Sequence, residues 1–191
     1  MSQPLRQATK IMVMRHAEKP ATDFTPYGVS LEGAREKESL SVRGWQRAGA
    51  LANFFAPTNG RFQDSAIAEP HFLYASKPIK RKGSKRPLQT IMPLAERLAI
   101  RINSNFPRFD FEGMLEEAFL CKGVVLISWQ REYIPQIAGH ILSKKTPAPQ
   151  DWPEDRFDLV WVFDRDPSSD RYSFNQVPQR LLMGDWATPI K

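Results

Sequence analysis

An arginine and a histidine stand side by side where an apolar segment ends, at Arg15 and His16. The residues before them, 11–14, are all apolar. A neutral imidazole is a nucleophile near pH 7, and a guanidinium matches the oxygens of phosphate two at a time. The pair therefore predicts a site for an oxyanion in which His16 is the reacting group. The alternative is a buried strand that simply ends in solvent.

Further arginines lie near two other predicted strand ends. Arg86 is part of GSKRPLQT and stands directly before a predicted helix, whose N-terminus favours an anion through its unpaired N–H groups and its dipole. Gln130, Arg131 and Glu132 follow the strongest predicted strand. Two or three arginines around one histidine suit an oxyanion pocket better than a structural motif.

Short apolar runs predict the strands that would position these residues. They cover 10–14, 71–76 and 123–129, and the last is β-branched and apolar on both faces, which is typical of the centre of a parallel sheet. Two later runs, 157–166 and 171–177, predict a C-terminal β-hairpin at or near a sheet edge.

Helices are predicted between these strands. Ser41 suits the N-cap of a helix over 42–55, where apolar residues recur at helical spacing. Pro87 suits the first turn of the next helix, and Pro93 is expected to kink or restart it. Further helices are predicted at 109–120 and 134–142.

The alternation of strands and helices predicts an α/β fold of three layers, with a mainly parallel central sheet and helices on both faces. Residues 1–191 are enough for a single domain with a substantial core. In such sheets ligands bind beyond the carboxyl ends of the strands. We therefore expect the site where three strands end: at Arg15 and His16, after Ser76, and after Trp129.

Composition narrows the class of protein. Hydrophobic residues make up 41% and charged residues 25%, the balance of an ordinary globular protein. Apolar runs such as 124–127 are far too short to cross a membrane, and the segment MSQPLRQATK has no apolar leader. We expect a cytoplasmic protein with no membrane partner. The single cysteine, Cys121, excludes an intramolecular disulfide and a thiolate metal cluster.

A net charge of +6 favours anionic partners such as phosphate esters, nucleic acids or acidic surfaces. Basic residues concentrate in KPIKRKGSKR, residues 77–86, and a nucleic-acid-binding module is one interpretation of this segment. Aromatic residues are not interleaved with its charges, and no nucleic-acid-binding motif occurs. We therefore expect a loop on the phosphate side of the site and no nucleic-acid partner.

Four segments, in the right order, resemble the histidine phosphatase superfamily, also called phosphoglycerate mutase-like. MRHAEKP resembles its Arg-His-Gly/Ala-Glu signature, and LSVRGWQRAGALANFF resembles the segment that follows it there. RPLQTIMPLAERL is similar to its Arg-x-x-Gln-Thr helix. VVLISWQREYIPQIAGHIL resembles the last core strand and helix of a bacterial branch, and WPEDRFDLVWVF fits that branch. The resemblance implies a phosphoglycerate mutase-like fold over most of the chain.

The resemblance also implies a chemistry. In that superfamily the first histidine attacks phosphorus and forms a phosphohistidine, so His16 would be the nucleophile. Arg15 and Arg86 match the two arginines that hold the phosphate. No metal or other cofactor is required, and the sequence has no cluster of carboxylates or histidines at ligand spacing. The expected substrate is a phosphorylated small molecule or a phosphoprotein.

The chain departs from the superfamily at Arg131, where its members carry a second histidine. The two other histidines cannot replace it: His140 lies too far along the following helix, and His71 begins its strand at the opposite edge of the sheet. An arginine stays protonated, so it supplies charge but cannot act as an acid or base. We expect Arg131 to bind phosphate, to fill the pocket, or to pair with Glu18 or Glu132.

The leaving group needs a proton. In one branch of the superfamily the acid directly follows the second histidine, a place that Glu132 occupies. Asp110 and Glu112 are alternatives, and each of the three can equally be a solvated carboxylate. Glu18 and Lys19 extend the first motif, and we expect them to support the groups that touch the substrate.

Two classes of function remain open. The first is a phosphohydrolase, a phosphomonoesterase that forms a phosphohistidine on His16, with a mutase as a variant of the same chemistry. The second is a catalytically impaired or inactive relative that binds a phosphorylated ligand or partner through the same pocket, because Arg131 replaces the second histidine. The polar segment 21–39 is expected to overhang the site. Substrate identity and oligomeric state have no signature in the sequence.

Overall fold

One sheet of six strands runs through the structure, in the order β3-β2-β4-β1-β5-β6. The computed structural model describes residues 6–21, 25–78, 83–142 and 148–191. The strands are β1 (Ala8–Arg15), β2 (Phe72–Ala75), β3 (Ile102–Asn103), β4 (Gly123–Trp129), β5 (Leu159–Asp166) and β6 (Arg171–Pro178). The first four are parallel, and β5 and β6 form an antiparallel hairpin at one edge. The predicted mainly parallel sheet with a C-terminal hairpin at its edge is confirmed.

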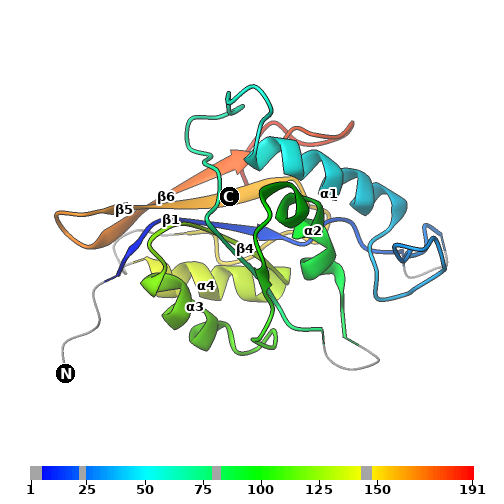
Figure 1. Ribbon diagram of the computed structural model, residues 1–191, viewed down its shortest axis with the longest axis horizontal. Helices are drawn as coiled ribbons and strands as arrows, with labels where there is room; N and C mark the ends of the chain where they lie inside the picture. The colour runs from blue at the N-terminus through cyan, green and yellow to red at the C-terminus, as the bar shows by residue number, and fades with distance from the viewer. Residues whose placement is uncertain (1–5, 22–24, 79–82, 143–147) are drawn as a thin grey trace.

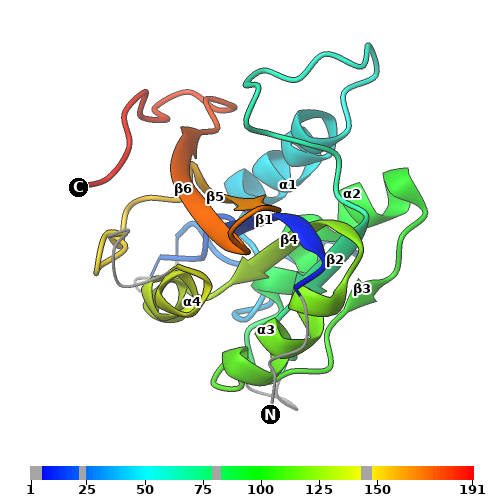
Figure 2. The same cartoon turned by 90° about the vertical axis from the view of Figure 1, so that its left-hand side faces the viewer.

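Helices cover both faces of the sheet, as predicted. They are α1 (Val42–Phe55), α2 (Arg86–Leu98), α3 (Phe111–Leu120) and α4 (Ile134–Ile141), with a short 3₁₀ helix η1 (Arg131–Tyr133) before α4. Figure 1 shows α1 on one side of the sheet and α3 with α4 on the other, and the turned view in Figure 2 keeps that separation. In the part of the chain that the structure describes, no helix has the length and apolar character needed to cross a membrane.

Side chains of β1 alternate between the two faces of the sheet. Ile11 and Val13 pack in the cluster with α3 and α4, and Met12 and Met14 pack in the cluster with α1 and α2. All four are fully buried. Because β1 lies inside the sheet and is covered on both sides, it requires a continuous apolar run.

β3 and η1 have no counterpart among the predicted elements, and β1 and α2 differ from their predicted forms. β1 extends beyond the predicted 10–14, because it pairs with β4 from Ala8 onward. α2 continues through Pro93, so the predicted restart is wrong. A proline inside a helix removes one backbone hydrogen bond, and the buried side chains of Ile91 and Leu94 hold the helix against the sheet on either side of it.

The strands β1, β4 and β2 end level with one another. Arg15 is paired with Trp129, and Ala75 is paired with Ser128. The backbone N–H of His16 donates to the carbonyl of Trp129 at 3.1 Å. Since parallel strands with level ends bring the following segments to one edge, the three exits meet in one place.

Candidate active site

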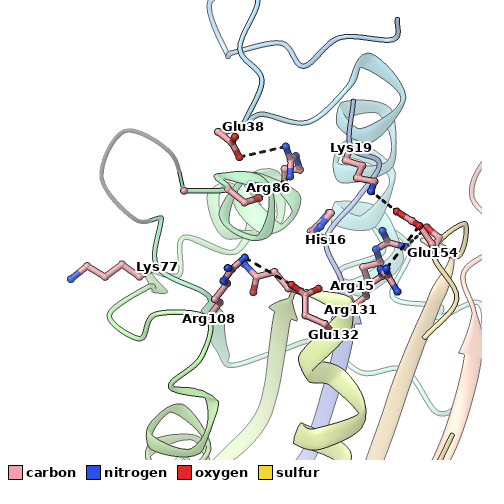
Figure 3. Close-up of a pocket in the computed structure, with 13 residues that line it drawn as sticks. Arg15, His16, Lys19, Glu38, Lys77, Arg86, Arg108, Arg131, Glu132 and Glu154 are labelled. Atoms are coloured by element: carbon pink, nitrogen blue, oxygen red, sulfur yellow. Dashed lines mark hydrogen bonds and ion pairs between the residues drawn. The ribbon is translucent and has the colours of Figure 1, made fainter. Parts of the chain in front are cut away.

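A pocket of about 730 Å³ opens where the three strands end (Figure 3). Six residues predicted from the sequence line it: Arg15, His16, Lys19, Arg86, Arg131 and Glu132. Figure 3 shows Arg15 and Arg131 on one side of His16 and Arg108 on the other. The structure thus brings the exits of β1 and β4 and the start of α2 around one cavity.

His16 is held as a neutral ring. Its side chain is buried, and Nδ1 lies 2.7 Å from the carbonyl oxygen of Ala17, to which it donates. No described residue hydrogen bonds to Nε2. Burial lowers the pKa of His16 to about 3, which the bond to Ala17 opposes and the charges of Arg15 and Arg86 assist. Nε2 therefore keeps its lone pair at neutral pH, as a nucleophile requires.

Arg15 has one edge of its guanidinium engaged and the other edge available. Nη1 donates to the carbonyls of Pro153, Glu154 and Arg156, at 3.3, 2.6 and 3.0 Å. The group lies over Phe157, 3.8 Å from the ring centroid. Among the residues that the structure describes, Nε and Nη2 have no hydrogen-bond partner. This second edge is the fork that can bind two phosphate oxygens.

Arg86 begins α2 and lines the same pocket. Its Nε donates to the carbonyl of Ser39 at 3.2 Å, and Nη2 donates to that of Lys37 at 2.7 Å. Glu38 lies 3.6 Å from Nη2. Burial lowers the pKa of Arg86, and Glu38 opposes that shift. These contacts fix Arg86 at the positive end of the helix dipole, where an anion is favoured.

The rest of the RPLQT motif ties α2 to the segments beside the pocket. Gln89 accepts a hydrogen bond from the backbone N–H of Leu40 at 3.0 Å and donates to the hydroxyl of Ser39 at 2.8 Å. Thr90 Oγ1 accepts from the backbone N–H of Ala17 at 2.8 Å. Both side chains are buried. The motif therefore holds the start of the helix against the backbone next to His16.

The LSVRG motif attaches the start of α1 to the segment that follows β1. Ser41 caps α1: its hydroxyl accepts from the backbone N–H of Gly44 and donates to the carbonyl of Glu18, each at 3.1 Å. A Cβ at Gly44 would lie 2.5 Å from that carbonyl oxygen, so only glycine allows this approach. The Glu18 carboxylate pairs with Arg43 and Arg47 of α1 and does not line the pocket.

Arg131 lines the pocket but extends toward the segment that follows α4. Its Nη1 donates to the carbonyl of Trp152 at 3.3 Å, and its Nη2 lies 3.9 Å from Glu154 Oε2. The expected pairing with Glu18 or Glu132 is therefore wrong. The side chain meets a loop whose path the sequence did not indicate.

Glu154 is an acidic pocket residue that sequence reasoning missed. Its carboxylate lies 2.7 Å from Lys19 Nζ and 3.9 Å from Arg131 Nη2. The hydrogen bond from Lys19, then the charges of Lys19 and Arg131, lower its pKa. Burial, then the charge of Arg131, lowers the pKa of Arg15 to about 10, and Glu154 opposes that shift. Its segment is rich in proline, and the only signal for it was the similarity of WPED to the bacterial branch.

Of the three candidate acids only Glu132 lines the pocket. Its carboxylate lies 4.0 Å from Arg108 Nη1, and both side chains are half exposed. Asp110 is the N-cap of α3, and Glu112 lies in the first turn of that helix. Neither of these two lines the pocket.

The two other histidines have structural partners away from the pocket. His140 Nε2 lies 3.0 Å from Glu112 Oε1. His71 Nδ1 accepts from the backbone N–H of Val124 at 3.0 Å, just before β2 begins. As expected, neither takes the place of a second pocket histidine.

The basic segment 77–86 contributes its two ends to the pocket, at Lys77 and Arg86. Residues 79–82, which carry the centre of that charge, lie outside the described residues. Across the described ranges, no three side chains of histidine, cysteine, aspartate or glutamate gather as a metal site would require.

Comparison with known proteins finds similarity in structure only. The sequence matches no family model and no curated protein. A mycobacterial glucosyl-3-phosphoglycerate phosphatase in complex with VO3 aligns over 88% of this chain and 97% of its own, with a TM-score of 0.52 and 11% identity. A protein assigned as the phosphohistidine phosphatase SixA of Agrobacterium tumefaciens aligns over 83% of this chain and 92% of its own, with a TM-score of 0.46 and 13% identity. Mycobacterial hydrolase 2 aligns over 88% of this chain and 88% of its own, with a TM-score of 0.47 and 11% identity.

The likeness to the glucosyl-3-phosphoglycerate phosphatase concerns the fold, and it extends over nearly all of both chains. It is the fold that the four sequence motifs imply. His16 follows β1, Arg86 begins α2 and Arg131 follows β4, so the motifs meet at one edge of the sheet. The chain has the same fold as this phosphatase, a mainly parallel sheet with helices on both faces.

Proposed function

We propose that the protein is a phosphomonoesterase that forms a phosphohistidine on His16. One observation carries this proposal: His16 and Arg15 line the same pocket, and each has nitrogen atoms with no hydrogen-bond partner among the described residues. They are Nε2 of His16 and the Nε–Nη2 edge of Arg15. Phosphoryl transfer is catalysed mainly by positioning and by stabilising charge, which a nucleophile beside a bidentate donor supplies.

The reaction consists of two displacements at phosphorus. In the first, Nε2 of His16 attacks, the bond from phosphorus to the ester oxygen breaks, and the leaving oxygen takes a proton. In the second, water attacks phosphorus and loses a proton, the N–P bond breaks, and Nε2 recovers its lone pair. The carbonyl of Ala17 holds Nδ1–H throughout, so it stabilises the ring while positive charge develops on it.

Arg15 and Arg86 are the proposed phosphoryl-holding groups, and Arg131 adds a third positive charge at the pocket. Glu132 is the proposed proton source, because it alone of the three sequence candidates lines the pocket. Lys19 is proposed to support this arrangement through its ion pair with Glu154. Glu18 is proposed to do so from outside the pocket, through α1.

The test is phosphate release from 4-nitrophenyl phosphate. The wild-type protein should release phosphate and His16→Ala should not. His140→Ala, which removes an exposed histidine outside the pocket, should keep the wild-type rate. Rapid quenching after a ³²P-labelled ester should trap an acid-labile label that His16→Ala lacks. A wild-type rate no faster than that of His16→Ala would overturn the proposal.

A binder of phosphorylated ligands is the second candidate, and Arg131 is the observation that favours it. This residue supplies charge but no acid–base chemistry, and it is already engaged by Trp152 and Glu154. Calorimetry with inorganic phosphate distinguishes the two functions. Binding by a wild-type protein that shows no turnover supports the second candidate, and turnover that depends on His16 rejects it.

A further inference from the structure

Arg108 lines the pocket, although no sequence motif indicated it. Arg108 lies between β3 and α3. Figure 3 shows its guanidinium on the opposite side of His16 from Arg15 and Arg131. A phosphoryl group held by Arg15 at the exit of β1 therefore leaves Arg108 for another part of the ligand.

The backbone of Arg108 is held in place by its neighbours. Trp129 Nε1 donates to the carbonyl of Arg108 at 2.9 Å, and Trp129 is fully buried. Lys77, two residues after β2, and Pro107, the residue before Arg108, form an isolated parallel β-bridge. With neighbouring strands about 4.8 Å apart, the β3 position lies roughly 14 Å from β1. Arg108 therefore approaches the pocket from the wall opposite β1.

The only ion pair of Arg108 within the described ranges is a weak one. Its Nη1 lies 4.0 Å from Glu132 Oε1, and the side chains are 52% and 51% exposed. Exposed ion pairs at the limit of contact contribute little, since water solvates both partners. The guanidinium of Arg108 is therefore available to an anion of the ligand.

The charge of the pocket exceeds what one phosphoryl group neutralises. With His16 neutral, its described lining has a formal excess of three positive charges, from six cations and three carboxylates: Arg15, Lys19, Lys77, Arg86, Arg108 and Arg131 against Glu38, Glu132 and Glu154. A phosphate monoester brings about −1.5 to −2 near neutral pH. The cavity of about 730 Å³ is also of the size that encloses whole small ligands.

We infer that the ligand of this pocket carries a second anionic group, a carboxylate or a further phosphate, and that Arg108 binds it. The inference depends on the proposed function, because it takes the phosphoryl group to lie against His16 and Arg15. Arg108 is then a residue that determines specificity, and it takes no part in the transfer itself.

The experiment compares substrates that differ only in that second charge. Two matched pairs serve: 3-carboxypropyl phosphate with 3-carbamoylpropyl phosphate, and 4-carboxyphenyl phosphate with 4-carbamoylphenyl phosphate. The wild-type protein should prefer the acid of at least one pair by about 10- to 100-fold in kcat/KM, as expected for a hydrogen bond between charged groups. Arg108→Gln should abolish this preference, because it should lower kcat/KM on the acids more than on the amides. Arg101→Gln, which removes an exposed arginine outside the pocket, should keep the preference.

Binding to His16→Ala separates the inference from the proposed function. If calorimetry gives tighter binding of the acid than of the amide, and Arg108→Gln in that background removes the difference, the inference stands even where the wild-type protein shows no turnover. Turnover with equal kcat/KM on both members of both pairs overturns the inference and leaves the phosphatase standing. An equal loss on acids and amides in Arg108→Gln also overturns it, since Arg108 would then bind the phosphoryl group.

Discussion

The surroundings of His16, and not a neighbouring acid, keep its ring neutral. The carbonyl of Ala17 fixes the proton on Nδ1, and burial beside Arg15 and Arg86 disfavours a second proton. A histidine in water is partly protonated at mildly acidic pH. Because the pKa of His16 is about 3, the proposed nucleophile keeps its lone pair at a pH where an exposed histidine would lose it.

The first prediction concerns the titration of His16. Because its pKa in the folded protein is about 3, the ring should stay neutral between pH 7.5 and pH 5.5. Below about pH 6.5 the unfolded chain binds a proton that the folded protein does not, so the free energy of unfolding should fall as the pH drops. In NMR spectra, the ring signal that is missing from His16→Ala should not shift over this range. A midpoint near pH 6.5 would contradict the prediction.

The second prediction concerns Arg131. If its lack of acid–base chemistry limits turnover, Arg131→His should raise kcat on 4-nitrophenyl phosphate by up to about 10²-fold, the typical effect of one well-placed donor. Arg131→Gln is the matched control, because it removes the charge without supplying an imidazole, and it should give no gain. If Arg131→His is no faster than wild type, the limit lies elsewhere in the pocket.

At the scale of elements, backbone contacts position the site. α1 packs directly on the carbonyl of Glu18, and α2 holds the N–H of Ala17 through Thr90. The two helices thus fix the loop after β1 from the same face of the sheet. Ser41, Gly44 and Thr90 make these contacts although none of them lines the pocket.

The third prediction uses two glycines of α1. A Cβ at Gly44 would meet the carbonyl oxygen of Glu18 at 2.5 Å, whereas one at Gly49 would meet nothing within 4 Å. Gly44→Ala should lower the free energy of unfolding by about 1–3 kcal/mol and reduce phosphate release, because the helix must shift. Gly49→Ala should raise that free energy by about 0.5–1 kcal/mol and leave activity unchanged. Urea unfolding measures both, and equal effects of the two changes would contradict the explanation.

Much of the architecture could be predicted because it has local signals. Apolar runs predicted the strands, and the Ser41 cap and the prolines at helix starts predicted the helices. The alternation of strands and helices predicted the mainly parallel sheet. The paths of loops have no such periodicity. Glu154 and Arg108 reach the pocket through contacts made by distant residues, such as Trp129 with the carbonyl of Arg108. The partner of Arg131 could not be predicted for the same reason.

At the scale of the whole molecule, Arg47 connects the site to the end of the fold. Its guanidinium lies 2.8 Å from Glu18 and 2.7 Å from Asp185, and Nη1 donates to Gln179 at 2.8 Å. Burial alone would lower the pKa of Arg47, but hydrogen bonds to Asp185 and Glu18 raise it. The loop after β1, helix α1 and the segment after β6 are therefore held by one buried charge network.

The fourth prediction compares two arginines that bind the same carboxylate. The Arg47 side chain is 2% exposed and that of Arg43 is 45% exposed, and both pair with Glu18. Arg47→Met should destabilise the protein by about 3–5 kcal/mol, because it removes the buried positive charge that the carboxylates of Glu18 and Asp185 share. Arg43→Met should cost at most about 1 kcal/mol. Thermal unfolding of the two variants checks this, and similar costs would show that burial does not set the difference.

The contacts of Arg15 and Arg47 also determine when the site can form during synthesis. Arg15 is held by carbonyls of residues 153–156, and Arg47 by Asp185, so both partners lie more than a hundred residues further along the chain. A nascent chain that has emerged only as far as β4 already contains His16, Arg15 and Arg86, together with the carbonyls that hold Arg86. It still lacks the carbonyls that hold Arg15 and the carboxylate of Asp185. On the ribosome, the ability to bind phosphate should therefore arise late, once residue 185 has left the exit tunnel.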